Sequence, residues 1–126
     1  MDSERRLLYS GYASIAFQLL HNAYHVVSSE AGFPFSGVIN SFTITLFFYP
    51  LAFLMIFMTL KNRTSKEGWI MTFLWGLVAS IYVHLVSGEE TFPSSILGAA
   101  ILLGQIASMA FGMYASFSVD LSVAKK

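Results

Sequence analysis

The sequence has no cysteine and few charged residues, and both shortages limit what the chain can do. Without cysteine, its 126 residues form no disulfide, no thiolate metal site and no thiol nucleophile. Charged residues make up 11% of the sequence and hydrophobic residues 56%, whereas soluble domains carry about 25% charged residues. Nearly the whole chain is therefore expected to lie in a lipid bilayer, with no separate soluble domain.

Charge is also missing from the interior of the apolar runs. No Asp, Glu, Lys or Arg lies deep inside any of them, so proton relays and ion-coupled transport lack their usual carriers. The chain has no glycine-rich phosphate loop. Its basic residues are scattered over short segments and its net charge is zero, which argues against a nucleic-acid partner.

Four continuous apolar runs predict four membrane-spanning helices. Each is close to the roughly 20 residues that cross a bilayer as a helix, and lipid admits only helices or closed barrels as spanning structures. The predicted fold is an all-α integral membrane protein, with 1–126 as one four-helix bundle made of two helical hairpins. The expected spans are 7–27, 38–60, 69–86 and 96–117.

The basic residues predict the orientation of this bundle. All seven Lys and Arg residues precede the first run, separate the second from the third, or follow the fourth. By the positive-inside rule, both termini then lie in the cytoplasm. We expect a multi-pass protein of the cell membrane whose two other connections face outward.

A twelve-residue segment occurs twice, at His25–Ser36 and again at His84–Ser95, with seven identical positions. The identity ends abruptly on both sides, so a decayed duplication and a convergence of two loops both stay open. Each copy places a histidine near the end of an apolar run and a Phe-Pro loop after it. Ser36 and Ser95 are expected to cap the helices that follow.

Small and polar residues recur at helical spacing along the runs and predict close packing of the helices. The residues assigned to this packing role are Gly76, Ser80, Gly104, Ser108 and Gly112. Pro50 lies near the middle of the second run, where a missing N–H is expected to kink the helix.

The three histidines predict a metal or haem site. His21 and His25 are four residues apart on one helix face, and His84 lies at a similar depth near the end of the third run. Neutral imidazole binds copper, zinc and iron, so the three form a candidate copper or zinc site. His25 and His84 alternatively hold a haem between two helices, or all three are polar interface residues bonded to neighbours. Possible additional ligands are Glu30, Glu89 and Asn22.

With little material outside the apolar runs and no charged residue deep inside them, the chain is poorly equipped to act as an independent enzyme or transporter. We expect a small integral subunit of a larger membrane complex, in contact with lipid and with other integral subunits. A metal- or haem-dependent oxidoreductase is the natural host, in which the chain has a structural role or supports the histidine site. One alternative is a self-contained haem-, copper- or zinc-binding bundle that carries electrons or handles metal. Another is a small homo-oligomeric transporter or channel with Gly104, Ser108 and Gly112 at the protomer contact.

Overall fold

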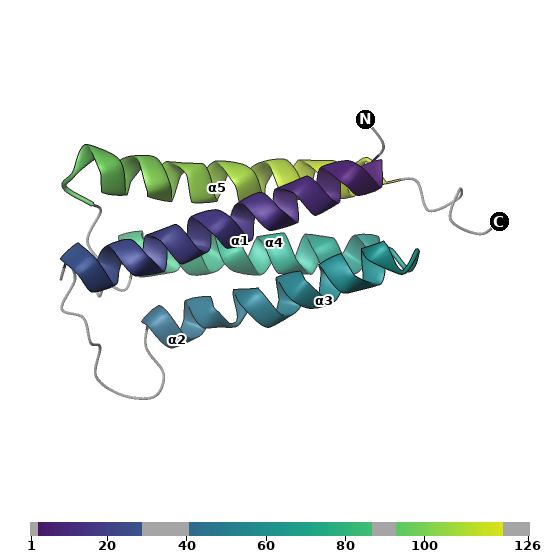
Figure 1. Cartoon of the computed structure of the whole chain (residues 1–126), viewed down its shortest axis with the longest axis horizontal. Helices are drawn as coiled ribbons and strands as arrows, with labels where there is room; N and C mark the ends of the chain where they lie inside the picture. The colour runs from purple at the N-terminus through teal and green to yellow at the C-terminus, as the bar shows by residue number, and fades with distance from the viewer. Residues whose placement is uncertain (1–2, 29–40, 87–92, 120–126) are drawn as a thin grey trace.

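The computed structural model describes residues 3–28, 41–86 and 93–119, and all regular structure in these ranges is helical. The elements form four rods, because α3 follows α2 directly and the π-helix η2 continues α4 (Figure 1). This confirms the all-helical prediction. The elements are α1 (Ser3–Ser28), α2 (Ser41–Leu46), α3 (Phe48–Leu60), α4 (Lys66–Ile81), η2 (Tyr82–Val86) and α5 (Ile96–Phe117).

The four rods pack as a ring in which each helix touches two neighbours. The most extensive contacts join α1 to α5 and α4 to α5, and α3 completes the ring by packing against α1 and α4. The start of α1, the connection from α3 to α4 and the end of α5 lie at one end of the bundle (Figure 1). We call this end the basic end and the opposite one, to which α1 and η2 run, the histidine end.

Three of the four rods are long and apolar enough to cross a membrane, so the prediction of four such spans is met only in part. They run over Thr43–Leu60, Lys66–Val86 and Ile96–Phe117, the last with the predicted bounds. The rod α1 is long enough, but polar residues such as Gln18, His21 and Asn22 lower its hydropathy. The first residues of the predicted span 38–60 lie outside the described ranges.

The second rod is interrupted as Pro50 predicts. The helix breaks at Phe47, three residues before Pro50, and restarts as α3. Proline cannot donate to the carbonyl four residues earlier, and its ring crowds that carbonyl. The break therefore follows from the covalent structure of Pro50 and not from packing alone.

α1 is polar on its inner face and apolar on its outer face. Six of its eight buried residues are polar or glycine, among them Ser14, Gln18 and His21. Large apolar side chains such as Leu19, Leu20 and Val27 are exposed. In water this arrangement would bury polar groups and expose apolar ones, which is the reverse of what the hydrophobic effect favours.

The half of the bundle next to the basic end is filled by an apolar core. Trp69 and Phe73 of α4 stack with ring centroids 5.2 Å apart, and both side chains are fully buried. Glycines make room for these rings. A Cβ on Gly11 would lie 2.7 Å from the Trp69 ring, and a Cβ on Gly112 would overlap Phe73.

A serine caps the start of α4 at the basic end and the start of α5 at the histidine end. Ser65 accepts a hydrogen bond from Gly68 N at 3.0 Å at the start of α4, and Ser95 does the same for Gly98 N, also at 3.0 Å, at the start of α5. The Ser95 cap confirms the prediction, whereas Ser36 lies outside the described residues. The Ser65 cap begins the third helix at Lys66, earlier than residue 69, because polar residues form its first turn.

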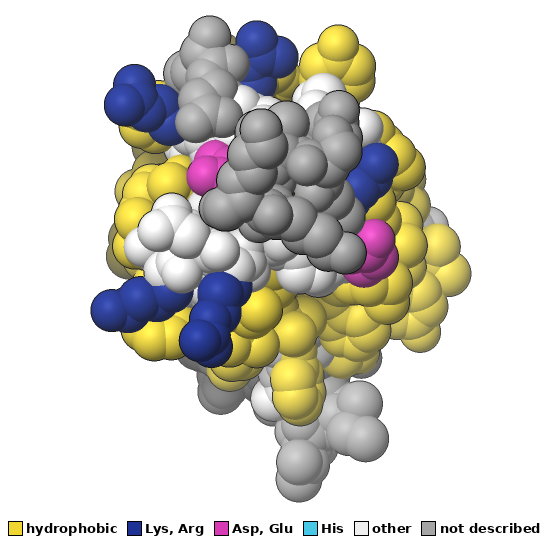
Figure 2. Space-filling model, turned by 90° about the vertical axis from the view of Figure 1, so that its right-hand side faces the viewer, with side chains coloured by type: hydrophobic (Ala, Val, Ile, Leu, Met, Phe, Trp, Pro, Cys, Tyr) yellow, Lys and Arg dark blue, Asp and Glu magenta, His cyan; other side chains and the backbone are white. Residues whose placement is uncertain are grey.

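The basic end carries the charged residues of the described chain. Figure 2 shows Lys and Arg side chains spread around this face, with apolar side chains behind them. Lys61 and Lys66 lie 5.9 and 6.0 Å from the ring centroids of Phe57 and Phe117. Long basic side chains beside aromatic rings are typical of the boundary between lipid and water. The described basic residues are Arg5, Arg6, Lys61, Arg63 and Lys66.

Candidate metal centre

Two helices bring the three histidines together at the histidine end. His21 and His25 lie one turn apart on the inner face of α1, and each is 3% exposed. His84 comes from η2, which continues α4 on the far side of the ring. It is half-buried. The sequence alone predicts that His21 and His25 share one helix face. The position of His84 beside them follows only from the packing of the helices.

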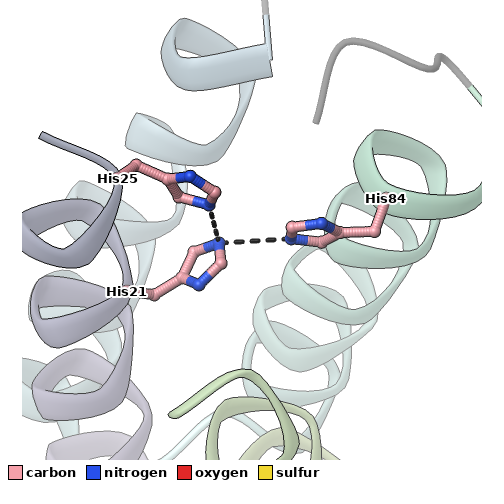
Figure 3. A group of neighbouring side chains, drawn as sticks. All are labelled: His21, His25 and His84. Carbon is pink, nitrogen blue, oxygen red and sulfur yellow. Dashed lines mark hydrogen bonds between the residues drawn. The ribbon is translucent and has the colours of Figure 1, made fainter. Parts of the chain in front are cut away.

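The ring nitrogens of His25 and His84 both lie close to one atom of His21, its Nε2. His21 Nε2 lies 3.0 Å from His25 Nε2 and 3.2 Å from His84 Nε2 (Figure 3). One nitrogen from each ring belongs to a set whose members all lie within 4.8 Å of one another. The rings of His21 and His25 are perpendicular, at 90°, with their centroids 4.4 Å apart.

The helix is widened where it carries His84. Residues Tyr82–Val86 form a π-helical turn at the end of α4. Such turns are rare, and those inside α-helices occur frequently at functional sites. Here the turn buries Val83 and leaves His84 half-buried, facing His21.

A layer of neutral polar side chains lies one helical turn inward from the histidines, and we call it the polar layer. Gln105 Nε2 donates to Gln18 Oε1 at 2.6 Å and to Ser80 Oγ at 2.9 Å. Gln18 Nε2 in turn donates to Asn22 Oδ1 at 3.0 Å, and Asn22 Nδ2 donates to Tyr49 Oη at 2.9 Å. These bonds connect α1, α3, α4 and α5.

The polar layer was only partly foreseen. Asn22, predicted as an additional ligand, instead uses both ends of its amide on Gln18 and Tyr49. Tyr49 was not singled out, and its signal was weak because a tyrosine in an apolar run also suits a lipid interface. Gln105 gave a stronger signal, since an amide inside an apolar span needs a partner there.

The remaining predicted residues fall into two groups. Glu30 and Glu89 lie outside the described residues. The small residues of α5 face other helices of the same chain: Gly104 meets Phe17, Gly112 meets Phe73, and Ser108 Oγ accepts a hydrogen bond from Ser14 Oγ at 3.1 Å. On α4, Gly76 adjoins Met109, and Ser80 donates to the Gly76 carbonyl at 2.8 Å.

Two of the three separations between the ring nitrogens are close to those around a metal ion. Four ligands placed tetrahedrally at about 2.05 Å from an ion are about 3.3 Å apart. The two short Nε2 separations, 3.0 and 3.2 Å, are close to this value. The described set contains imidazoles alone, which is the ligand type shared by zinc and copper sites.

Comparison with known proteins gives no match for this chain. No protein-family model, curated protein or solved structure matches the chain. Any functional conclusion therefore depends on the residues and their geometry.

Proposed function

We propose that this chain is an integral membrane bundle that binds one transition-metal ion through His21, His25 and His84. The observation that carries the proposal is the crowding at His21 Nε2, which has two other ring nitrogens within 3.2 Å. A neutral or protonated ring nitrogen has a single in-plane proton or lone pair. It can form one good hydrogen bond with a neighbouring ring, but not two. A metal ion between the rings replaces both contacts with three bonds.

The same crowding favours an ion over a haem. A haem held by His25 and His84 needs the space between their nitrogens for a flat porphyrin. His21 Nε2 occupies this space, 3.0 Å from one nitrogen and 3.2 Å from the other. The haem alternative therefore requires His21 to move away, whereas an ion uses it as a ligand.

The donor set favours copper(I) as the first candidate and zinc(II) as the second. Three imidazoles are neutral ligands, so the charge of the ion is not cancelled by the described site. The cost of holding an ion in a low-dielectric interior rises with the square of its charge, so a dication costs about four times as much as a monocation. Zinc is the better candidate if Glu30 or Glu89 supplies a negative charge.

Titration tests this proposal directly. The purified chain in mild detergent, stripped with a chelator, is titrated with copper(I) under reducing conditions and with zinc(II). We expect one ion per chain, and at least a hundredfold weaker binding in His21→Ala than in the original chain. The matched control is Asn22→Ala, which removes a neighbouring polar side chain but no proposed ligand. Equal binding by the original chain and His21→Ala would refute the metal site.

The inverted polarity of α1 supports placement in a bilayer. Its buried face carries Gln18, His21 and His25, while Leu19 and Val27 are exposed. Lipid suits this exposed face, and polar side chains inside the bundle can bond to one another. With the three more apolar rods, α1 then completes four spans with both termini on the cytoplasmic side of the cell membrane.

The absence of cysteine allows a clean test of this topology. A single introduced cysteine is the only thiol in the chain. Ser94→Cys lies at the histidine end and Arg63→Cys at the basic end, and both positions are exposed. In intact cells, a membrane-impermeant maleimide should label Ser94→Cys but not Arg63→Cys. Labelling of Arg63→Cys without permeabilisation would overturn the orientation.

A second proposal concerns the setting of this site, as a subunit of a metal-dependent membrane oxidoreductase. Its support is the aromatic outer surface, because rings exposed on the bundle can pack against further membrane helices as well as lipid. Examples are Phe53, Phe57, Phe111 and Tyr114, each about half exposed or more. Purification in mild detergent should then recover stoichiometric larger subunits with the chain. A monomer that is stable and fully metal-loaded alone would favour the self-contained metal-binding bundle.

A further inference from the structure

The amide of Gln105 has one polar atom that the described chain leaves without a bond. Gln105 is 1% exposed, and its nitrogen is used twice, on Gln18 and Ser80. Among the described residues, none forms a hydrogen bond with Gln105 Oε1. A buried amide oxygen without a partner destabilises the folded chain. Buried polar groups of this kind are usually bonded to an ordered water molecule.

Turning the amide over still leaves one of its polar atoms without a bond among the described residues. Oxygen and nitrogen of a glutamine amide have nearly the same shape, so the reversed orientation fits the same space. The nitrogen would then take the place of Oε1 and need an acceptor, while the oxygen would face Gln18 Oε1 and Ser80 Oγ. A ligand at this position must therefore either donate to an oxygen or accept from a nitrogen. A hydroxyl group does both.

We propose that Gln105 holds a small hydroxylic ligand, of which water is the simplest, within the polar layer. The other members of this layer are neutral and polar: the amides of Gln18 and Asn22 and the hydroxyl of Ser80. No charged side chain takes part in the described bonds of this layer, so the site selects a neutral ligand over an ion. The site exists with or without a metal ion at the histidines.

The surroundings determine the side from which this water enters. One turn from Gln105 toward the basic end, Met109 is 0% exposed, and it packs beside Gly76 together with Phe48, which is 1% exposed. Beyond them lie the stacked rings of Trp69 and Phe73. These apolar side chains close the route from the basic end. Water therefore reaches Gln105 past the three histidines, which makes the polar layer the closed inner end of the histidine site.

Solid-state NMR in lipid bilayers tests this proposal, because the chain has only two glutamines, Gln18 and Gln105. Glutamine labelled in the side-chain amide gives two signals, and Gln18→Met assigns them. We expect rapid magnetisation transfer from water to the Gln105 amide. The dry control is the Trp69 indole N–H, which is buried and bonded to Thr59 Oγ1 at 2.9 Å.

Two variants show where the water is held. Gln105→Met keeps the approximate volume but has no amide, so water transfer to Gln18 should fall at least threefold. Ser108→Ala, one turn away on the same helix, should leave this transfer unchanged. The proposal is overturned if Gln105 is as dry as Trp69, or if Gln105→Met leaves the transfer to Gln18 unaltered. The measurement uses metal-free protein, so its outcome does not depend on the outcome of the metal titration.

Discussion

The two halves of the bundle hold the four helices together by different kinds of contact. Toward the basic end, stacked aromatic rings fill spaces opened by glycine, as Trp69 does over Gly11. Toward the histidine end, polar contacts take the place of these rings. Imidazoles contact one another there, and amides form hydrogen bonds, as Gln18 and Gln105 do. In lipid, apolar burial between helices gives little driving force, so close packing and hydrogen bonds hold helices together. The apolar half is therefore held by close packing of its rings, and the polar half by hydrogen bonds between helices.

The largest effect on stability is expected from removing the central ring of the apolar half. Trp69→Ala leaves a cavity and the buried Thr59 hydroxyl without its donor. We expect a loss of about 3 kcal/mol, at the lower end of the range for such substitutions because lipid reduces the transfer contribution. The measurement is reversible unfolding in detergent micelles. Trp75→Ala, on the same helix but 40% exposed, should lose far less. Equal losses would remove the distinction between core and surface.

Overfilling the apolar half should cost somewhat less. Gly112→Val places a branched side chain against the Phe73 ring, which a Cβ at this position already overlaps. We expect about 2 kcal/mol of destabilisation, since the rings cannot move without disturbing the stack. Ala110→Val adds similar bulk at an exposed position of α5 and serves as the control. If both variants unfold alike, the close contact at Gly112 is not what limits the packing.

In the polar half, we expect single substitutions to lower the free energy of unfolding only modestly, and their effects to depend on one another. Gln18→Met and Gln105→Met each remove one partner of the same buried hydrogen bond, at about 1 kcal/mol apiece. The double variant should cost less than the sum of the two, because neither amide is then left without its partner. A double-variant cycle of unfolding free energies measures this difference. Strict additivity would mean that the two amides do not depend on each other.

The smallest effect is expected at the serine contact between α1 and α5. Ser14→Ala removes its hydrogen bond to Ser108, and interhelical bonds in membranes contribute about 0.6 kcal/mol on average. Ser116→Ala is the matched control, because Ser116 is equally buried but bonds to the Gly112 carbonyl of its own helix. Unfolding should show the larger loss for Ser14→Ala. The reverse order would place the α1–α5 contact energy elsewhere.

The sequence predicted the rods better than their ends and interruptions. The span 96–117 agrees with α5 because Pro93 and the Ser95 cap mark its start. Hydropathy marks the lipid-facing part of a helix and not its hydrogen-bonded ends, so the capped start of α4 at Lys66 was missed. The apolar run 7–27 was grouped with the other three, but the polar residues of its inner face make α1 less apolar than the other rods.

The candidate site shows the same division between local and long-range information. The four-residue spacing of His21 and His25 places both on one face, which local helix geometry ensures. That His84 reaches His21 across the ring depends on how the four rods pack together and on the π-helical turn at Tyr82–Val86. Neither follows from periodicity, because 63 residues separate the two histidines and π-helical turns have no reliable sequence signal.

X-ray absorption spectroscopy at the edge of the bound metal tests the three-histidine site most directly. The account predicts a first shell with three imidazole nitrogens at about 2.0 Å, recognisable by scattering from the outer ring atoms. In His84→Ala, whose side chain comes from η2 and not α1, the shell should lose one imidazole. A first shell without imidazole, or one unchanged in His84→Ala, would contradict the claim that these three histidines hold the ion.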